Sequence, residues 1–520
     1  MNAGSAPTGV HNVFVLVLEN RSFDHLLGFS AISGTDAVNG EDRSVDGLLG
    51  TETNSYQGKE YPVGHPANYA VPTDPGHEFS DVLMQLAGED AVYPEGGPYP
   101  EIDNSGFVAN YAANNSRRQT HLNPAEVMKC YEPSQLPVLT ALAHEFVVCD
   151  RWFSAMPGPT WPNRFFLHGA SSSDLDDSPS LDQLAEWELL HGFALPNGTI
   201  FDRLHAAGVP WRIYAGDNFP QVRALAGIKD SDLRPYANFS ADLTSASYPA
   251  AYTFIEPDYG HVTSDYRCGT SQHPLDDITR GERLIKCTYE TIRQSSTWET
   301  SLLVLTWDEH GGFYDHVAPP SAVPPGDTPL RRHNRHGFAF NQYGPRVPAV
   351  VVSPLIPKNL IDGRLYDHAS IVATVETLFG LPALTARDSA ANDLSTLVTL
   401  SEPRRDTPAV LPEPAASGVT GCRPVPACCP TAALSDAERG AALAPPRERP
   451  TPTRPEAPIE VDPNLAGFVH VALRRDLSIT PPSEHQERIA RARSVLTKAN
   501  ARDYLQEVDR RLSSASSTPN

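Results

Sequence analysis

Residues 13–18 read Val-Phe-Val-Leu-Val-Leu, and residues 19–25 continue directly as Glu-Asn-Arg-Ser-Phe-Asp-His. The first six residues are all apolar and do not alternate with polar ones, which is typical of a strand buried on both faces of a parallel sheet. The polar residues therefore follow the carboxyl end of a buried strand. Open α/β sheets bind their ligands at that edge.

Further apolar segments extend this pattern along the chain. Residues 302–306 and 347–352 also have the composition of buried strands. Four segments have helical features, the second and fourth with a glycine stop signal: 136–143, 200–207, 276–293 and 368–379. Because strands alternate with helices, we expect an α/β sandwich with a mostly parallel central sheet.

The remaining segments predict loops and a separate C-terminal part. Residues 35–99 are rich in Gly, Pro, Asn and Asp, which indicates long loops inserted after the first strand. Residues 402–458 contain 13 prolines and predict an extended segment or a linker. Beyond it we expect a strand over 467–473 and an amphipathic helix over 484–512. That helix would pack on the main domain or serve oligomerisation.

The charge balance excludes several kinds of partner. The 520 residues include 41 Lys and Arg against 63 Asp and Glu, a formal net charge of −22. Nucleic acids and anionic membranes attract clustered basic residues, so neither is an expected partner. A zwitterionic or small phosphorylated substrate and a metal site made of carboxylates stay possible. The longest clean apolar run, 13–18, is too short for a membrane span or the core of a signal peptide.

The seven cysteines form no CxxC motif, so we do not expect a zinc knuckle. Cys268 and Cys287 could pair across a loop. Free thiols are the alternative.

A second group of polar residues follows the predicted strand 302–306. Asp308 and Glu309 come shortly after it and are followed by two glycines, which allow a close backbone approach. Together with Glu19 and Asn20 they would suit a divalent cation such as Mg²⁺, Mn²⁺, Ca²⁺ or Zn²⁺. The alternative for Asn20 is the N-cap of a helix.

Thr160 follows a Pro/Gly turn and precedes a predicted helix over 163–170. A hydroxyl at a helix N-terminus beside a cation is well placed to attack phosphorus. The cation lowers the pKa of the hydroxyl, and the free N–H groups hold phosphoryl oxygens. The alternative is that Thr160 only caps the helix.

Three loop histidines, His77, His273 and His368, lie beside Pro, Gly or Asp near predicted junctions of elements. An imidazole in such a place can hold a phosphate or transfer a proton. The alternative, common for single histidines, is a surface or core position without function.

These motifs occur in one order and resemble the phosphoesterase family of bacterial phospholipases C, plant non-specific phospholipases C and related acid phosphatases. The resemblance covers about residues 11–400, and its most specific parts are 19–25, 160–164, 308–317 and 344–354. It implies an alkaline-phosphatase-like α/β/α fold. The expected organisation is a catalytic domain over 1–400, a Pro-rich segment over 401–460 and a C-terminal part over 461–520.

The resemblance also implies roles for individual residues. The implied metal ligands are Glu19, Asn20, Thr160, Asp308 and Glu309. Thr160 would be the nucleophile, and His77, His273 and Asn20 would act with it at the phosphoryl group. The residues expected to bind substrate or support the site are Asn163, Arg164, Asp276, His310, Asp315, His316 and His368.

The implied activity is metal-dependent hydrolysis of phosphoesters. Because the phospholipase branch commonly has Thr at the nucleophile position and the acid phosphatase branch Ser, Thr160 favours a phospholipase C. We expect it to cleave phosphatidylcholine-type lipids to diacylglycerol through a phosphothreonine intermediate. The alternatives are a broad-specificity acid phosphatase and a catalytically silent binding protein. Secreted family members usually carry a twin-arginine leader, and no such segment is visible here.

Overall fold

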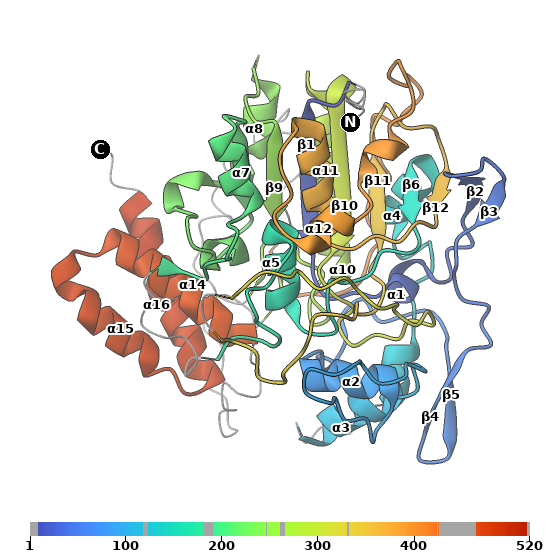
Figure 1. Ribbon diagram of the computed structural model, residues 1–520, viewed down its shortest axis with the longest axis horizontal. Helices are drawn as coiled ribbons and strands as arrows, with labels where there is room; N and C mark the ends of the chain where they lie inside the picture. The colour runs from blue at the N-terminus through green and yellow to red at the C-terminus, as the bar shows by residue number, and fades with distance from the viewer. Residues whose placement is uncertain are drawn as a thin grey trace.

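The computed structural model describes residues 9–117, 123–180, 191–245, 247–260, 266–329, 332–423, 425 and 464–516. Its centre is a ten-stranded mixed sheet with the strand order β3-β2-β12-β6-β11-β10-β1-β9-β7-β8 (Figure 1). The two central strands are β1 (Asn12–Leu18) and β10 (Ser301–Trp307). The other strands are β2 (Ser33–Asp36), β3 (Asp42–Ser44), β6 (Val147–Cys149), β7 (Trp211–Ala215), β8 (Leu233–Pro235), β9 (Tyr252–Glu256), β11 (Ala349–Val352) and β12 (Leu360–Asp362).

The sheet is mostly parallel, which confirms the predicted α/β class. β1 pairs in parallel with β10 on one side and with β9 on the other. The antiparallel pairings are β10 with β11, β11 with β6, and β2 with β3. All three predicted strands outside the C-terminal part are present. β1, β10 and β11 are almost completely buried, as their uninterrupted apolar sequences predict.

Two groups of helices cover the sheet. One group packs together around α5 (Thr160–Gly169) and consists of α7 (Ile200–Ala206), α11 (Ala369–Phe379) and α12 (Ala386–Ala390). The other group packs around α10 (Ile278–Gln294) and consists of α4 (Pro137–Glu145) and α8 (Phe239–Thr244). In Figure 1, α11 and α12 lie in front of the central strands. The chain therefore forms the α/β sandwich that the alternation of elements predicts.

A smaller layer lies at one end of the sheet, below the strands in Figure 1. It contains α2 (Phe79–Ala87), α3 (Phe107–Arg117) and the hairpin of β4 (Thr53–Tyr56) and β5 (Lys59–Pro62), while α1 (Phe23–Leu27) follows β1 directly. The expectation of loops alone over 35–99 was therefore wrong. Phe79, Val82 and Leu86 are buried and are spaced to lie on one face of a helix. This apolar pattern is short and is surrounded by Gly, Pro, Asn and Asp, so the composition of the segment predicted loops.

The C-terminal part is helical and consists of α14 (Asn464–Ile479), α15 (His485–Arg493) and α16 (Lys498–Ser516). The predicted strand over 467–473 was wrong. Its β-branched residues belong to α14, which is buried along most of its length because it packs against α15, α16 and η2. The single helix predicted over 484–512 is two helices, and Leu496, between them, is 70% exposed. Short 3-10 turns complete the described chain: η1 (Pro124–Met128), η2 (Gln221–Ala224), η3 (Asp230–Asp232), η4 (Tyr236–Asn238), η5 (Trp298–Thr300), η6 (Leu394–Leu397) and η8 (Pro482–Glu484).

The described part of the Pro-rich segment, 402–423, contains no helix or strand, as predicted, and 426–458 lie outside the described residues. It runs along α10, where Lys286 Nζ donates to the carbonyl of Leu411. This path brings Cys422 to Cys268, and the two form a disulfide. The predicted Cys268–Cys287 pair was therefore wrong, since the fold and not the sequence spacing selects the partner. Among the described helices, none is long and apolar enough to cross a membrane.

Candidate active site

The polar residues after β1 and β10 meet at the carboxyl ends of these strands. Leu18 is in register with Trp307, so the segments that begin at Glu19 and Asp308 leave the sheet side by side. The backbone N–H of Asn20 donates to Asp308 Oδ1 at 3.0 Å. The backbone N–H of Arg21 donates to the carbonyl of Glu309 at 2.8 Å. Parallel pairing of two buried strands thus places the four predicted oxygen-bearing residues together.

Thr160 lies at the N-terminus of α5, which begins at this residue and not at Asn163 as predicted. Its side chain is fully buried, and its hydroxyl donates to Asn20 Oδ1 at 3.3 Å. The structure thereby joins the predicted nucleophile to the predicted metal-binding residues. Asn163 holds the preceding turn, because its Nδ2 donates to the carbonyls of Gly158 and Pro159 at 2.9 and 3.0 Å.

Arg164 forms a buried ion pair with Asp308, with 2.9 Å between Nε and Oδ2. Its Nη2 also donates to the carbonyl of Leu18 at 3.1 Å. This guanidinium therefore ties α5 to the ends of both central strands. Burial raises the pKa of Asp308, and Arg164 opposes that shift.

Among the described residues, one carboxylate oxygen of Glu19 and one of Glu309 accept a hydrogen bond, and the other oxygen of each does not. Gln221 Nε2 donates to Glu19 Oε1 at 3.4 Å, and the N–H of Gly311 donates to Glu309 Oε2 at 2.7 Å. Within the described residues, the buried Glu19 Oε2 and Glu309 Oε1 have no hydrogen-bond partner. Burial and the negative charge of Asp308 raise the pKa of Glu309 to about 8 and that of Glu19 well above its ordinary value.

These leftover oxygens fit a hard cation. Buried carboxylate oxygens without a donor are costly, and a divalent ion takes oxygen ligands. Asn20 and Thr160 add neutral oxygens to the same place.

The two predicted phosphoryl-contacting histidines lie on separate loops, His77 beside Glu309 and His273 beside Asp74. His77 Nδ1 lies 4.0 Å from Glu309 Oε1. His273 Nε2 lies 3.7 Å from Asp74 Oδ1, and its Nδ1 accepts from the N–H of Leu275 at 3.3 Å. The ring of His273 stacks on Tyr266, with 4.3 Å between centroids.

Two other predicted histidines support backbone and carboxylate groups. His368 Nε2 lies 2.5 Å from the carbonyl oxygen of Asp308, and burial lowers the pKa of His368 to about 4. His310 lies between Gln85, at 2.7 Å, and Glu309 Oε2, at 3.4 Å. Burial lowers the pKa of His310 to about 3, so both imidazoles are neutral. The N–H of Asp276 donates to the carbonyl of His273 at 2.7 Å.

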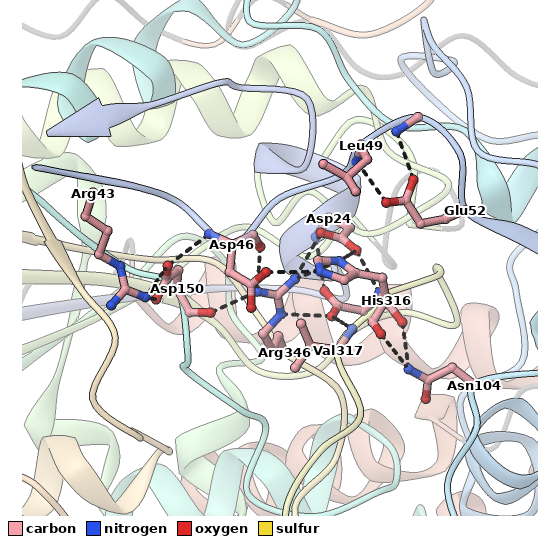
Figure 2. Close-up of polar contacts among 12 residues, drawn as sticks. Asp24, Arg43, Asp46, Leu49, Glu52, Asn104, Asp150, His316, Val317 and Arg346 are labelled. Carbon is pink, nitrogen blue, oxygen red and sulfur yellow. Dashed lines mark hydrogen bonds and ion pairs between the residues drawn. The ribbon is translucent and has the colours of Figure 1, made fainter. Parts of the chain in front are cut away.

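His316 clusters with Asp24 and Arg346 (Figure 2), and Asp315 contacts the same arginine. Arg346 donates to Asp315 Oδ1 at 2.8 Å and to Asp24 Oδ1 at 3.0 Å. His316 Nδ1 lies 2.7 Å from Asp24 Oδ2. Partial burial disfavours the imidazolium, but hydrogen bonds with Asp24 and Asp46 raise the pKa of His316 to about 10. The two buried carboxylates of this cluster, Asp24 and Asp315, therefore face two cations.

The donor atoms of Asp24, Asp315 and His316 all lie within 4.8 Å of one another, which is also close enough for a metal. In the part of the chain that the structure describes, Glu19, Asp308 and Glu309 do not meet that closely. The cluster around Arg346, however, has its charges balanced by protein groups, whereas Glu19 and Glu309 have oxygens without donors.

Four residues of this region were not predicted from the sequence: Arg21, Asp74, Gln85 and Gln221. Asp74, Gln85 and Gln221 belong to segments that carry no motif of their own. Arg21 lies inside the motif 19–25, and its place in that motif could have identified it as a site residue.

Comparisons with known proteins identify relatives of the chain. The family model described as "Phosphoesterase family" matches residues 10–382. Non-specific phospholipase C3 of Arabidopsis thaliana is 33% identical over 429 residues, which cover 79% of this chain and 77% of that protein. Non-specific phospholipase C6 of the same plant is 35% identical over 424 residues, covering 78% and 75%. Phospholipase C A of Mycobacterium tuberculosis is 24% identical over 512 residues, covering 89% and 92%.

Solved structures match more weakly. A protein in the alkaline phosphatase superfamily from Vibrio parahaemolyticus aligns with a TM-score of 0.31 and 15% identity, covering 51% of this chain and 63% of that one. The fold assignment therefore rests on the sheet topology and on the family match.

The family match and the relatives named phospholipase C place the protein among the phosphoric ester hydrolases. The chain belongs to the phosphoesterase family, whose model covers most of the sandwich.

Proposed function

We propose that this protein is a phospholipase C that hydrolyses phosphatidylcholine-type lipids to diacylglycerol and a phosphorylated head group. The observation that carries the proposal is the position of the Thr160 hydroxyl. It is buried at the N-terminus of α5 and bonded to Asn20, beside carboxylates with unpartnered oxygens. The relatives named phospholipase C, from plants and a bacterium, support this choice of substrate class.

Glu19, Asn20, Thr160, Asp308 and Glu309 would hold a divalent cation, with Mg²⁺, Mn²⁺, Ca²⁺ and Zn²⁺ as candidates. When bound, such an ion lowers the pKa of a coordinated hydroxyl and offsets the negative charge on the oxygens of the phosphoryl group. Arg164 keeps Asp308 oriented through its ion pair.

The protein residues then account for a two-step reaction. Thr160 Oγ1 gives up its proton to solvent and forms a bond to phosphorus. The bond to the diacylglycerol oxygen breaks, and His273 would protonate that oxygen as it leaves. The free N–H groups at the start of α5 hold phosphoryl oxygens, and His77 and His273 contact the same group. Water then attacks phosphorus from the opposite side and releases Thr160.

The experiment that tests this function is the Thr160→Ala substitution. We expect turnover of p-nitrophenyl phosphorylcholine to be lost, while the thermal unfolding midpoint stays nearly unchanged. Thr140→Ala, on the outer helix α4, is the control and should keep wild-type activity. Activity of Thr160→Ala within tenfold of wild type would remove Thr160 from the nucleophile role.

The substrate class is tested separately from the nucleophile. Side-by-side assays of p-nitrophenyl phosphate, p-nitrophenyl phosphorylcholine and vesicles of phosphatidylcholine, phosphatidylethanolamine or phosphatidylinositol separate a phospholipase from an acid phosphatase. We expect the choline diesters to be preferred. A clear preference for the monoester would indicate an acid phosphatase that uses the same residues, and no turnover of any of these would favour a binding protein.

A further inference from the structure

Arg21 is a buried cation without a counter-ion in contact. Its side chain has no exposed surface. Within the described residues no carboxylate lies within ion-pair distance of it, although Asp276 and Asp74 act on its pKa from farther away. Its Nη1 has no hydrogen-bond partner there either. A guanidinium keeps its charge at all ordinary pH values, so burial without a carboxylate partner is costly. The contacts that offset this cost are hydrogen bonds to backbone carbonyls.

The hydrogen bonds of Arg21 go to the loop that carries His273. Nε donates to the carbonyl of Gln272 at 2.7 Å, and Nη2 donates to the carbonyl of His273 at 3.2 Å. The guanidinium lies over the ring of Phe313, 5.1 Å from its centroid. The ring supports the guanidinium from one side, and the planar group reaches two neighbouring carbonyls at once.

The loop that Arg21 contacts, at Gln272 and His273, has a strained backbone. Gln272 has φ 68°, a left-handed conformation that side chains with a Cβ rarely adopt. Trp307 Nε1 donates to Gln272 Oε1 at 3.0 Å, which holds the side chain of the same residue. His273 comes directly after this strained position, so its ring direction depends on how the two carbonyls are held. Strained residues of this kind occur where the surrounding structure fixes a functional group.

We propose that Arg21 is a positioning residue, which acts on the reaction by holding the carbonyls of the strained Gln272 and of His273, and thereby the imidazole of His273 that lies between them. The proposal rests on the proposed function, since it needs His273 at the phosphoryl group. Arg21 itself is not assigned a contact with the substrate.

A double-mutant cycle with Arg21→Lys and His273→Gln tests the proposal. Lys keeps the charge but cannot donate to two carbonyls in a fixed plane. In the wild-type background, Arg21→Lys should lower kcat for p-nitrophenyl phosphorylcholine about tenfold, with KM and bound metal little changed. In the His273→Gln background the same substitution should change kcat less than twofold, because the group that Arg21 positions is already gone.

Arg346→Lys is the matched control. Arg346 is as buried as Arg21 and touches none of the proposed catalytic side chains. Its effect on kcat, whatever its size, should be the same in both backgrounds. Equal effects of Arg21→Lys with and without His273 would overturn the proposal, and so would wild-type activity of His273→Gln.

Phe313→Leu provides a milder second variant if Arg21→Lys does not fold. It removes the ring beneath the guanidinium and leaves both hydrogen bonds in place. We expect a smaller loss of kcat that also vanishes in the His273→Gln background, and an undiminished loss there would contradict the proposal. Failure of the proposed function would appear separately, as full turnover by Thr160→Ala.

Discussion

At the scale of single residues, the candidate site combines one carboxylate that is paired with an arginine and two that, among the described residues, have no such partner in contact. Asp308 has Arg164, whereas Glu19 and Glu309 each have a buried oxygen without a donor. Burial raises the pKa of all three carboxyls. A group of buried acids whose ionised forms are disfavoured is expected where a cation is to be bound.

Asp308→Asn tests this interpretation. We expect the purified variant to contain much less metal than the wild type by elemental analysis, because it loses an anionic ligand. Asp367→Asn is the control, since Asp367 forms a similarly buried pair with Arg387 at 3.1 Å outside the site. Both variants should lose stability, and only the first should lose metal. Stoichiometric metal in Asp308→Asn would refute its role as a ligand.

The raised pKa of His316 predicts a pH dependence of stability. In the folded protein the imidazolium is held by Asp24 and Asp46, and its pKa is about 10, against about 6.5 for an unfolded histidine. Unfolding therefore releases a proton between these values. The stabilisation is fully present below about pH 6.5 and is lost as the pH rises through about 10.

The measurement is urea unfolding of the wild type and His316→Gln at pH 7 and pH 9. The wild type should lose about 1–2 kcal/mol more than the variant over this interval. Comparison of the two proteins cancels the titration of other groups. Parallel losses in both proteins would show that Asp24 does not hold the imidazolium.

At the scale of elements, the strands whose ends bear the candidate site residues could be predicted, and the elements around them only in part. β1, β10 and α10 follow from long apolar or periodic stretches. α14 was predicted as a strand because Phe468, Val469 and Val471 favour that state locally, and packing against other helices overrides this preference. The Cys268–Cys422 pair depends on the path of a Pro-rich segment, which no local pattern specifies.

α14 packs against Trp161, the residue that follows the proposed nucleophile Thr160. Trp161 Nε1 donates to the carbonyl of Asn464 at 3.1 Å, and the Trp161 ring lies 5.3 Å from that of Phe468. Gly467 faces the same indole so closely that a Cβ would lie 2.1 Å from Trp161 Cε2. The glycine therefore allows this helix to approach Trp161.

Gly467→Ala should lower the free energy of unfolding by about 1–3 kcal/mol through overpacking, although alanine favours helices more than glycine does. Turnover should fall as well, because Trp161 is bonded to Thr160 through the backbone. Thermal unfolding and the p-nitrophenyl phosphorylcholine assay provide the measurements. A variant that is more stable than the wild type would show that α14 is not packed tightly on Trp161.

At the scale of the whole molecule, the sequence motifs predicted the fold class and the residues that the fold brings together. They could not predict the groups that reach the site from segments without motifs. Asp74 meets His273 across two loops, and Gln221 reaches Glu19 from η2. These contacts depend on how distant segments pack, which is not encoded in any short stretch of sequence.

If hydrolysis proceeds in two steps through Thr160, the configuration at phosphorus must record both of them. The substrate would be a phosphatidylcholine analogue made chiral at phosphorus by sulfur substitution and hydrolysed in isotopically labelled water. Two successive in-line displacements give net retention of configuration, which is the result that we predict. Net inversion would mean that water attacks the lipid directly, and it would contradict the account.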